Sequence, residues 1–511
     1  MDQLRIVFRT DANQQIGTGH FMRCLTLADE IRRSTADIWF VARELPMYLQ
    51  QMLIEHGVRY LALPKPDTTT QSIDELAHAS WLQTSQAIDA EQTLAALGEG
   101  SWNWLVVDHY ALDHRYEKLL RKVCKHVMVI DDLADRVHDC DVLLDQNYYQ
   151  DQDQRYLGKV PSHCRMLLGA KFALLRPEFK AMREKVKART GKVKNILVFF
   201  GGVDADNLTG QVLEVIINLK LDVHVDVVIG QQHPQKETIQ KLCTQHNYTC
   251  HVQTNRMADL MAQADLAIGA GGTTVWERFC LGLPSVCFAA ASNQVHQLQD
   301  LQLAGLLFSP IHYEDPITFL FSYLKNLGTG FKLLHEQSER VMKLVDGRGA
   351  SKVATVLRAK SLHVRLAEAQ DASAIFQWRN HQLIKDHSGN NQEISWDEHR
   401  QWFEQRLKNG DPILIGELDE DPVGVVRFDI SNHQATVSVY LVPESGFNGW
   451  GGALLIQSES WLRKHHPRVA TLHAQVLPNN EPSKKLFAKL NYTLTANQPK
   501  FEFVKNVEAC L

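Results

Sequence analysis

The sequence predicts two Rossmann-like α/β units in tandem, followed by a smaller α+β domain. In the first part of the chain, short runs rich in β-branched residues alternate with amphipathic helical patterns, which is typical of βα units around a parallel sheet. A second alternating series starts after a basic stretch at residues 185–194. At about Ser361 the pattern changes to antiparallel-looking strands, then a glycine-rich turn and a helix. The 511 residues agree with three domains, because domains typically have about 100 to 200 residues.

These changes of pattern place the three domains at residues 1–190, 191–360 and 361–511. We expect the strands of the first two domains near residues 6–11, 36–42, 104–110, 126–132, 141–147, 195–202, 224–230, 250–254, 265–272 and 283–290. The basic residues from Lys185 to Lys194 are interpreted as a solvated linker. Two such units in tandem predict a cleft between them, and domain interfaces often hold ligands.

Composition and charge exclude several classes of protein. The chain is 44% hydrophobic and 22% charged, and its 54 Lys and Arg against 59 Asp and Glu give a net charge of -5. This balance favours neither nucleic acid nor an anionic membrane surface as a partner. The nine cysteines include no CxxC pair, so neither a zinc site nor a disulfide framework is indicated. The chain has no signal-peptide-like start and no run of about 18 apolar residues, so we expect a cytoplasmic protein.

The first glycine-containing loop follows the first predicted strand. Gly17, Gly19 and His20 lie at the turn between that strand and a helix. Glycines there let the backbone approach a ligand, and the helix start offers unpaired N–H groups and a partial positive charge. His20 is therefore a candidate catalytic residue at the mouth of this site. The alternative is a structural hydrogen bond, which is the commoner use of a histidine at a helix start.

The run Ile16–Cys24, preceded by Arg9 and Asp11, resembles the opening of the pseudaminic acid pathway hydrolases. These enzymes cleave UDP from a 2,4-diacetamido-2,4,6-trideoxy-L-altrose nucleotide. Further matching segments follow in order: Asp108–Tyr110, Asp131–Asp132, Leu144–Asn147 and Leu168–Pro177. The resemblance covers about residues 1–350 and implies the two-domain, GT-B-like architecture of the lipid-linked glycosyltransferases of cell-wall synthesis.

The resemblance also implies roles for individual residues. His20 would be the catalytic base and Tyr110 a partner in the sugar site. The chemistry agrees, because UDP is a good leaving group and a neutral imidazole can accept a proton from an attacking water near physiological pH. For Tyr110 and Asp108, the alternative is a strand end that packs against the following helix. The other matched residues near the loop would contact the substrate: Arg9, Asp11, Gly17 and Gly19.

A second glycine-rich turn lies in the second unit. The amides of Gly271, Gly272 and Thr273 would hold phosphates at the start of a helix, and Glu277, one turn later, would reach a ribose. In UDP-sugar transferases and similar hydrolases a glutamate so placed binds ribose hydroxyls, so the resemblance implies a uridine diphosphate site. The alternative for Glu277 is an ordinary first-turn acid favoured by the helix dipole.

Two further segments flank this turn. Asn293 and Gln294 follow the next strand, where enzymes of the resembling group contact the sugar or diphosphate. Residues 201–204 form another turn, for which phosphate contact and a simple tight turn are both open. No Asp-rich cluster accompanies these loops, so the diphosphate must be held by backbone donors and no metal is expected.

From about Ser361 the chain resembles the Gcn5-related N-acetyltransferase (GNAT) superfamily, particularly its branch acting on amino-sugar nucleotides. The matching segments are Gln377–Asn380, His399–Phe403, Val437–Pro443 and Asn448–Leu455. In this fold a splayed strand and the next helix start bind coenzyme A, which implies acetyl-CoA as cosubstrate. The residues that would contact it are Val442, Gly449, Gly451 and Asn480. For Asn480 the alternative is a helix cap.

The chain departs from the superfamily pattern at two places. Gly446 stands where Gln or Arg is usual, and Phe487 replaces the tyrosine that protonates the departing thiolate. Tyr440 and Tyr492 are candidates for that general acid. His399 and Glu398 would be placed to relay a proton from the substrate ammonium, but surface helix residues are the simpler interpretation.

The leading hypothesis is a bifunctional enzyme of pseudaminic acid biosynthesis. It would acetylate the 4-amino group of a UDP-amino-sugar with acetyl-CoA and hydrolyse the UDP-diacetamido sugar by water attack at C1. The alternative is a UDP-sugar glycosyltransferase with a catalytically silent, acyl-CoA-binding GNAT module. An exposed apolar patch near the N-terminal cleft would favour the alternative, and none is obvious from the sequence. The sequence predicts no particular oligomeric state.

Overall fold

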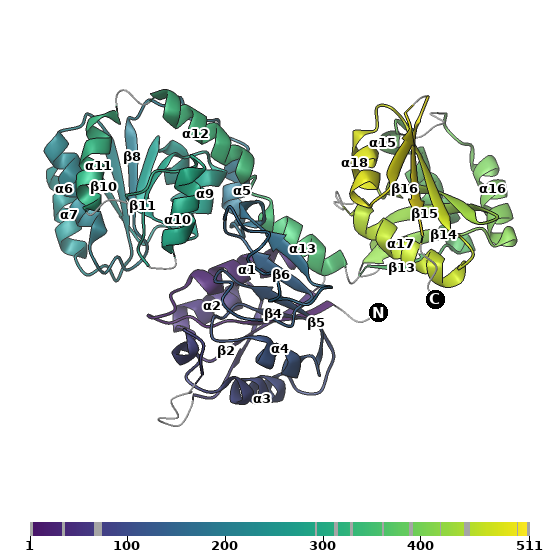
Figure 1. Ribbon diagram of the computed structural model, residues 1–511, viewed down its shortest axis with the longest axis horizontal. Helices are drawn as coiled ribbons and strands as arrows, with labels where there is room; N and C mark the ends of the chain where they lie inside the picture. The colour runs from purple at the N-terminus through teal and green to yellow at the C-terminus, as the bar shows by residue number, and fades with distance from the viewer. Residues whose placement is uncertain are drawn as a thin grey trace. The chain divides into compact units, whose positions relative to one another are not determined.

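The computed structural model describes residues 4–32, 36–65, 74–291, 294–310, 315–327, 331–359, 362–387, 392–418, 421–443, 450–497 and 499–507. The chain divides into two compact units, one formed by Arg5–Ala354 and the other by Thr355–Leu511 together with Met1–Leu4 (Figure 1). The first unit contains two separate parallel sheets, and the second contains one mixed sheet. Within the described residues, no helix is long and apolar enough to cross a membrane.

The first sheet has seven strands in the order β3-β2-β1-β4-β5-β6-β7. Strand β1 pairs in parallel with β4, β4 with β5, β5 with β6, and β6 with β7. Strands β2 and β3 also pair in parallel. The strands are β1 (Leu4–Arg9), β2 (Ala36–Ala42), β3 (Arg59–Ala62), β4 (Trp102–Val107), β5 (Cys124–Ile130), β6 (Val142–Asp145) and β7 (Arg165–Leu168). The helices along this part of the chain are α1 (Gly19–Ile31), α2 (Met47–Glu55), η1 (Ala79–Leu82), α3 (Gln86–Leu97), α4 (His114–Leu120) and η2 (Ala170–Phe172), and α5 (Pro177–Arg183) leads to the second sheet.

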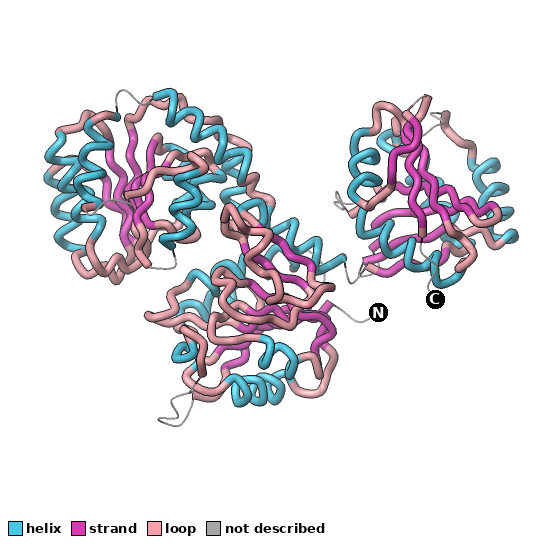
Figure 2. Tube along the Cα trace, in the orientation of Figure 1, coloured by secondary structure: helices cyan, strands magenta, loops and turns pink. Residues whose placement is uncertain are grey.

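The second sheet has five parallel strands in the order β10-β9-β8-β11-β12. They are β8 (Asn195–Phe199), β9 (His224–Ile229), β10 (Thr249–Val252), β11 (Leu266–Ala270) and β12 (Ser285–Phe288). Helices cover both faces (Figure 2): α6 (Leu208–Leu219), α7 (Lys236–Gln245), α8 (Met257–Gln263), α9 (Thr274–Cys280), α10 (Gln294–Leu303), α11 (Pro316–Lys325) and α12 (Phe331–Leu344). The next helix, α13 (Gly349–Ala359), lies instead against the first part of the chain, where Ser351 donates to Glu30 of α1.

Both sheets have a point at which the strand order reverses. It lies between β1 and β4 in the first sheet and between β8 and β11 in the second. In open α/β sheets, ligands bind outside the carboxyl ends of the strands at this point. The prediction of two parallel α/β sheets is confirmed, and the strands β3 and β7 at the edges of the first sheet are additional to those expected.

The segment between the two sheets is more deeply packed than the sequence suggested. Phe179 on α5 lies in the same buried core as Trp276 and Phe279 of α9. The guanidinium of Arg189 is buried and donates hydrogen bonds to the carbonyl oxygens of Ala264 (3.0 Å) and Met261 (2.7 Å), among others. The interpretation of Lys185 to Lys194 as a solvated linker was therefore wrong for Arg189, which satisfies carbonyl groups left at the end of α8.

The sheet of the second unit has the order β13-β14-β15-β16-β17-β19-β18. Its strands are β13 (His363–Leu366), β14 (Ile413–Leu418), β15 (Asp421–Ser431), β16 (Gln434–Leu441), β17 (Thr471–Val476), β18 (Thr493–Ala496) and β19 (Phe501–Asn506). Its helices are η4 (Ala369–Asp371), α14 (Ala372–Asn380), α15 (Gln382–Lys385), α16 (Trp396–Asn409), α17 (Gly451–His465) and α18 (Glu481–Lys489).

Strands β16 and β17 of this sheet are the only parallel neighbours among its described registers. They pair only over Gln434–Thr436 and Thr471–His473. Beyond these residues the two strands no longer pair, which leaves backbone groups of β16 available to a ligand. The expected α+β domain with a splayed strand is confirmed.

A glycine in β11 gives a testable consequence of the parallel packing. A Cβ atom on Gly269 would overlap the carbonyl oxygen of Phe199 on β8 and approach Nη1 of Arg278 to 3.0 Å. We expect Gly269→Ala to lower the free energy of unfolding by about 1–3 kcal/mol, because the backbone must shift. Gly272→Ala is the control, since its Cβ would meet only Nε2 of Gln294 at 3.7 Å. Equal urea midpoints for the two variants would contradict this account.

Candidate active sites

His20 is presented by a tight turn at the reversal point of the first sheet. The N–H of Gly17 donates to the carbonyl of Asn13 (2.9 Å), and the side-chain oxygen of Asn13 accepts from the N–H of Ile16 (2.7 Å). Gly17 has φ +76°, a left-handed conformation that favours glycine. A Cβ on Gly17 or Gly19 would meet no atom within 4 Å, so the backbone of this loop is accessible to a ligand.

His20 pairs with a carboxylate from the neighbouring strand. Its Nδ1 lies 2.6 Å from Oδ1 of Asp108, the first residue after β4. Arg23, one turn along α1, donates from Nε to Oδ2 (2.6 Å) and from Nη2 to Oδ1 (2.7 Å) of the same carboxylate. Burial alone would raise the pKa of Asp108, but the charges of Arg23 and His20 outweigh burial and hold that pKa well below its usual range.

Tyr110 lies beside this pair, and its role as a partner in the sugar site stays a prediction. Its ring is 4.6 Å from that of His20 in an edge-on arrangement. The Tyr110 hydroxyl donates to Oδ2 of Asp132 at 2.7 Å, and Nη1 of Arg23 donates to the same oxygen at 2.6 Å. Burial, followed by the charge of Asp132, raises the pKa of Tyr110, so its phenol stays protonated.

Two aromatic rings near His20 were missed from the sequence. Trp81 on η1 stacks on Tyr110 with ring centroids 5.5 Å apart, and its ring lies 6.2 Å from that of His20. His78 contacts both Trp81 (4.6 Å) and Tyr110 (5.3 Å). The segment that carries them has no glycine turn or strand pattern that would connect it to the His20 loop.

Arg9 and Asp11, predicted to contact substrate, are instead buried beneath the loop. Arg9 donates to both oxygens of Asp89 (3.0 and 2.8 Å), and its Nη1 lies 2.8 Å from Asp11. Asp11 also accepts the N–H of Arg43 (2.7 Å) and lies 3.1 Å from Nε2 of His109. Their exposures of 0% and 1% argue against direct substrate contact and indicate that they support the loop.

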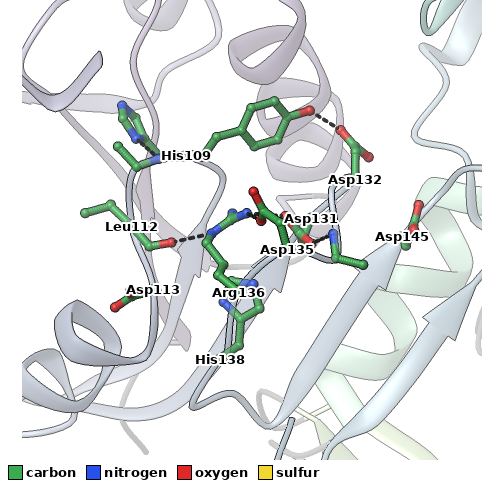
Figure 3. Close-up of polar contacts among 12 residues, drawn as sticks. His109, Leu112, Asp113, Asp131, Asp132, Asp135, Arg136, His138 and Asp145 are labelled. Carbon is green, nitrogen blue, oxygen red and sulfur yellow. Dashed lines mark hydrogen bonds and ion pairs between the residues drawn. The ribbon is translucent and has the colours of Figure 1, made fainter. Parts of the chain in front are cut away.

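Asp145 ends β6 close to this network and is 2% exposed. Burial, together with the nearby charge of Asp132, raises the pKa of Asp145 to about 8. The pKa of the nearby Asp131 is shifted in the opposite direction, because Arg136 lies 2.8 Å from this carboxylate (Figure 3). Burial alone would raise the pKa of Asp131, but Arg136 outweighs burial and lowers that pKa to about 2.

The pKa of Asp145 predicts a pH-dependent stability. Between the ordinary value of about 3.9 and about 8, the folded state binds a proton at Asp145 that the unfolded chain has lost, so rising pH destabilises the fold. Asp145→Asn removes this effect. We expect its free energy of unfolding, relative to the parent, to increase from about pH 5 to about pH 8, by up to about 1.4 kcal/mol per pH unit.

Asp131→Asn is the matched control for this experiment. Because the folded-state pKa of Asp131 is lowered, its stabilising effect is present above about pH 4 and lost as pH falls. This variant should be less stable than the parent by a nearly constant amount from about pH 5 to about pH 8. Urea unfolding that gave the same pH trend for both variants would show that Asp145 is ionised in the folded chain.

The second predicted loop brings together part of the expected nucleotide site. Gly271 is packed under Leu298 of α10, Gly272 lies against the side chain of Gln294, and Thr273 is exposed. Gln294 accepts the N–H of Ala290 at 3.0 Å, so its side chain is held at the turn before α10. Asn293 lies outside the described residues.

Glu277, predicted to bind a ribose, is paired with Arg176, which precedes α5. Nη2 of Arg176 donates to Oε1 of Glu277 at 3.2 Å. Burial raises the pKa of Glu277, and the charge of Arg176 only partly offsets this effect. The Glu277 side chain keeps 14% exposure.

Helix α10 connects the second loop to the first sheet. Gln297 donates to the side-chain oxygen of Asn147 (3.0 Å), and the amide of Asn147 donates to Oδ1 of Asp132 (3.1 Å). The N–H of Gln150 donates to Asp300 at 3.0 Å. These hydrogen bonds hold the segment that follows β6, which also contacts Asp132, against α10. Among the described residues, no group of His, Cys, Asp and Glu is arranged to hold a metal ion, and the expected independence of metal stays a prediction.

The mixed sheet contains a cavity of about 660 Å³ beside the unpaired part of β16. Val442 and Asn480, both predicted cofactor contacts, line it. The side-chain oxygen of Asn480 accepts a hydrogen bond from the N–H of Ser483 (3.1 Å), so Asn480 caps α18. The alternative interpretation of Asn480 as a helix cap is therefore confirmed. Gly451 begins α17, where its Cβ would be 3.5 Å from Leu486, and Gly449 lies outside the described residues.

The other side of this cavity carries charged and aromatic groups. Arg379 from α14 and Arg427 from β15 line it. Burial lowers the pKa of Arg379, so an anion in the cavity would offset the cost of its buried charge. Arg427 is paired with Asp429 at 3.0 Å. The Tyr440 hydroxyl is buried without a hydrogen-bond partner among the described residues, and burial raises its pKa.

The remaining candidates for proton transfer have structural partners. Tyr492 is 4% exposed and its hydroxyl donates to Glu459 (2.8 Å), so it is not among the residues lining the cavity. His399 is buried rather than on the surface, and its Nε2 lies 3.0 Å from the carbonyl oxygen of Ala372. Glu398 closes the capping box of α16 with Ser395. Tyr440, His399 and Glu398 all line the cavity, and the role of Tyr440 as general acid stays a prediction.

Comparison with known proteins gives two family matches. Residues 195–303 match the glycosyltransferase family 28 C-terminal domain, and residues 361–493 match the acetyltransferase (GNAT) domain. The chain is 26% identical over 289 residues to the UDP-2,4-diacetamido-2,4,6-trideoxy-beta-L-altropyranose hydrolase of Campylobacter jejuni, an alignment that covers 56% of this chain and 92% of the relative.

Two other similar proteins cover more of the chain. The uncharacterized protein MJ1062 of Methanocaldococcus jannaschii is 23% identical over 529 residues, which covers 99% of this chain and all of the relative (100%). A crystal structure of MurG from Acinetobacter baumannii covers 70% of this chain and 99% of that chain, with 16% identity and a TM-score of 0.48.

Proposed function

We propose that this chain, in which a homologue of UDP-2,4-diacetamido-2,4,6-trideoxy-beta-L-altropyranose hydrolase is fused to a GNAT acetyltransferase domain, catalyses two steps of pseudaminic acid biosynthesis. The first unit hydrolyses the UDP-diacetamido sugar to free sugar and UDP. The GNAT domain transfers acetyl from acetyl-CoA to the 4-amino group of the UDP-amino-sugar precursor. The observation that carries the hydrolase assignment is the pairing of His20 with Asp108 at the reversal point of the first sheet.

In the hydrolytic step, Nε2 of His20 accepts a proton from water as the water oxygen bonds to C1 of the sugar. The bond between C1 and the diphosphate oxygen breaks, and UDP leaves with the bonding electrons. The Tyr110 hydroxyl already donates to Asp132, so its oxygen can accept a hydrogen bond from a substrate hydroxyl or amide. The Gly271–Thr273 turn and Glu277 hold the nucleotide.

In the acetyl transfer step, one side of the cavity binds the acetyl donor and the other side binds the acceptor. The unpaired part of β16, Val442 and the start of α18, which line the cavity, hold the acetyl donor. The start of α17 contributes to the same site, as the match to the GNAT domain supports. Arg379 and Arg427 face the acceptor, where their charge suits the diphosphate of a nucleotide sugar. The substrate amine attacks the thioester carbonyl, and the protonated Tyr440 phenol gives its proton to the departing thiolate.

Hydrolysis in oxygen-18 water tests the first activity. The full chain is incubated with the UDP-diacetamido sugar, and both products are analysed by mass spectrometry. We expect the label in the free sugar, because water attacks C1. Label in UDP, or no UDP release without an added acceptor, would overturn the hydrolase. The second activity is tested by thiol release from acetyl-CoA with the UDP-4-amino sugar, and its absence would leave a silent GNAT module.

One observation favours the alternative of a glycosyltransferase. Helix α2 of the first sheet exposes Met47 (83%), Tyr48 (58%) and Ile54 (66%), an apolar group that the sequence did not reveal. Such a surface would suit an enzyme whose acceptor is embedded in a membrane. UDP release that starts only when a lipid-linked acceptor in vesicles is added would support this alternative.

A further inference from the structure

Within the described part of the chain, the hydrogen-bond contacts of the His20 ring are made through Nδ1. Nδ1 lies 2.6 Å from Oδ1 of Asp108, whereas Nη2 of Arg23 is 3.3 Å from the same nitrogen. An ionised carboxylate can only accept hydrogen bonds, and a guanidinium can only donate. The shorter contact therefore requires the proton on Nδ1. In the neutral ring, this leaves the lone pair on Nε2.

Asp108 is held in its anionic form by contacts on both of its oxygens. Its side chain is 0% exposed, and Arg23 donates to Oδ2 (2.6 Å) and to Oδ1 (2.7 Å). The thiol of Cys24 also donates to Oδ2, at 3.4 Å. The paired guanidinium fixes the plane of the carboxylate, because the two donors of such a fork are rigidly spaced. The orientation of the His20 ring follows from the orientation of this plane.

Arg23 is in turn held by a second carboxylate. Its Nη1 donates to Oδ2 of Asp132 at 2.6 Å, and Asp132 also accepts from Tyr110 (2.7 Å) and Asn147 (3.1 Å). One arginine thus connects the ends of three consecutive strands of the sheet, β1 through α1, β4 and β5. The cost of burying Asp108 is offset by a full set of charge-assisted hydrogen bonds.

From this arrangement we infer that Asp108 is a positioning residue that holds His20 in the tautomer with a basic Nε2, and that Arg23 keeps Asp108 aligned and anionic. The inference rests on the proposed hydrolase. When His20 takes the proton of water, Asp108 stabilises the imidazolium that forms. Loss of such a partner in comparable His–Asp pairs leaves the ring in place but in the wrong tautomer, with losses of up to about 10⁴-fold in rate.

The variant Asp108→Asn in the full chain tests this role. Arg23 requires an acceptor, so the oxygen of the introduced amide should turn to Arg23 and the amide nitrogen should donate to Nδ1 of His20. We expect kcat for UDP release to fall by about 100-fold or more, while KM changes by less than about threefold. The acidic limb of the pH–rate profile should move to lower pH, because the imidazolium loses its carboxylate partner.

The tautomer can be observed without catalysis. In ¹⁵N-labelled parent protein above the acidic limb, the His20 ring should show a protonated Nδ1 and an unprotonated Nε2, with its signals assigned by their loss in His20→Gln. In Asp108→Asn the pattern should reverse. A protonated Nε2 in the neutral parent would overturn the inference even if the variant fails to fold.

Asp131→Asn is the matched control, because Asp131 is equally buried and paired with Arg136 but does not contact His20. It should destabilise the chain without moving the acidic limb of the profile. Equal kcat and equal profiles for the parent and Asp108→Asn would overturn the positioning role. Failure of the proposed function gives a different result, since the parent itself would then release no UDP while the tautomer measurement still stands.

Discussion

Replacing His20 by alanine is expected to lower the rate of UDP release by about 10²- to 10⁴-fold, the usual contribution of a positioned general base. The substitution removes the ring that lies 2.6 Å from Asp108, while Asp108 keeps both hydrogen bonds from Arg23. Acetyl transfer should be unchanged, because the cavity that would carry it is built from residues of the mixed sheet and its helices. Both rates can be followed on the same preparation with the two nucleotide sugars.

The chain offers a matched control for this substitution. His56 forms a second His–Asp pair, with Nδ1 2.8 Å from Asp29, but its side chain is 38% exposed and it lies at the end of α2. His56→Ala should leave UDP release within about twofold of the parent, since an exposed pair of this kind contributes little to stability. If both variants retained full hydrolysis, another group would have to activate the water and the assignment of His20 would be wrong.

Replacing Arg379 by glutamine is expected to raise KM for the UDP-4-amino sugar by about 10- to 100-fold, because a hydrogen bond to a charged partner contributes about 1.5–3 kcal/mol. Burial lowers the pKa of Arg379, so its charge is costly to bury and becomes favourable beside a diphosphate. KM for acetyl-CoA should change by less than about twofold, since Val442 and Asn480 line the cavity independently of Arg379. Steady-state thiol release measures both constants.

Arg400→Gln is the control for this effect. Arg400 lies on α16 with a side-chain exposure of 54% and contacts Glu404 at 3.9 Å. It carries the same charge as Arg379 but is not among the residues that line the cavity. An equal rise in KM for both variants would indicate a general loss of positive charge, and no rise for Arg379→Gln would show that the anionic part of the acceptor binds elsewhere.

Local sequence patterns were sufficient for most of the fold. The continuous apolar runs at residues 127–130 and 142–144 lie in the buried strands β5 and β6. Such runs are typical of parallel strands covered on both faces. The short edge strand β3 was missed because its exposed and half-buried residues lack that pattern. Likewise, Arg189 looked like part of a charged linker, since nothing in a basic stretch distinguishes a guanidinium that satisfies buried carbonyls.

The candidate sites were predictable in part. The glycine turn before His20 and the strand end at Tyr110 could be recognised, and the structure brings these two residues into ring contact. Arg9 stood just as close to the same loop in sequence, yet its side chain points beneath the loop to Asp89. Alternate residues of a strand point to opposite faces, so proximity in sequence could not separate a ligand contact from a supporting ion pair.

The sequence was enough to place chemically useful groups at strand ends and helix starts, because those positions follow from the local periodicity of apolar residues and from glycines. Which of these groups meet was decided only by the tertiary structure. Asp108 is 88 positions from His20, and the two come together because β4 is the direct neighbour of β1 in the sheet. Strand order depends on packing across the whole unit, and so do the burial and charge balance that lower the pKa of Asp108 and raise the pKa of Asp145.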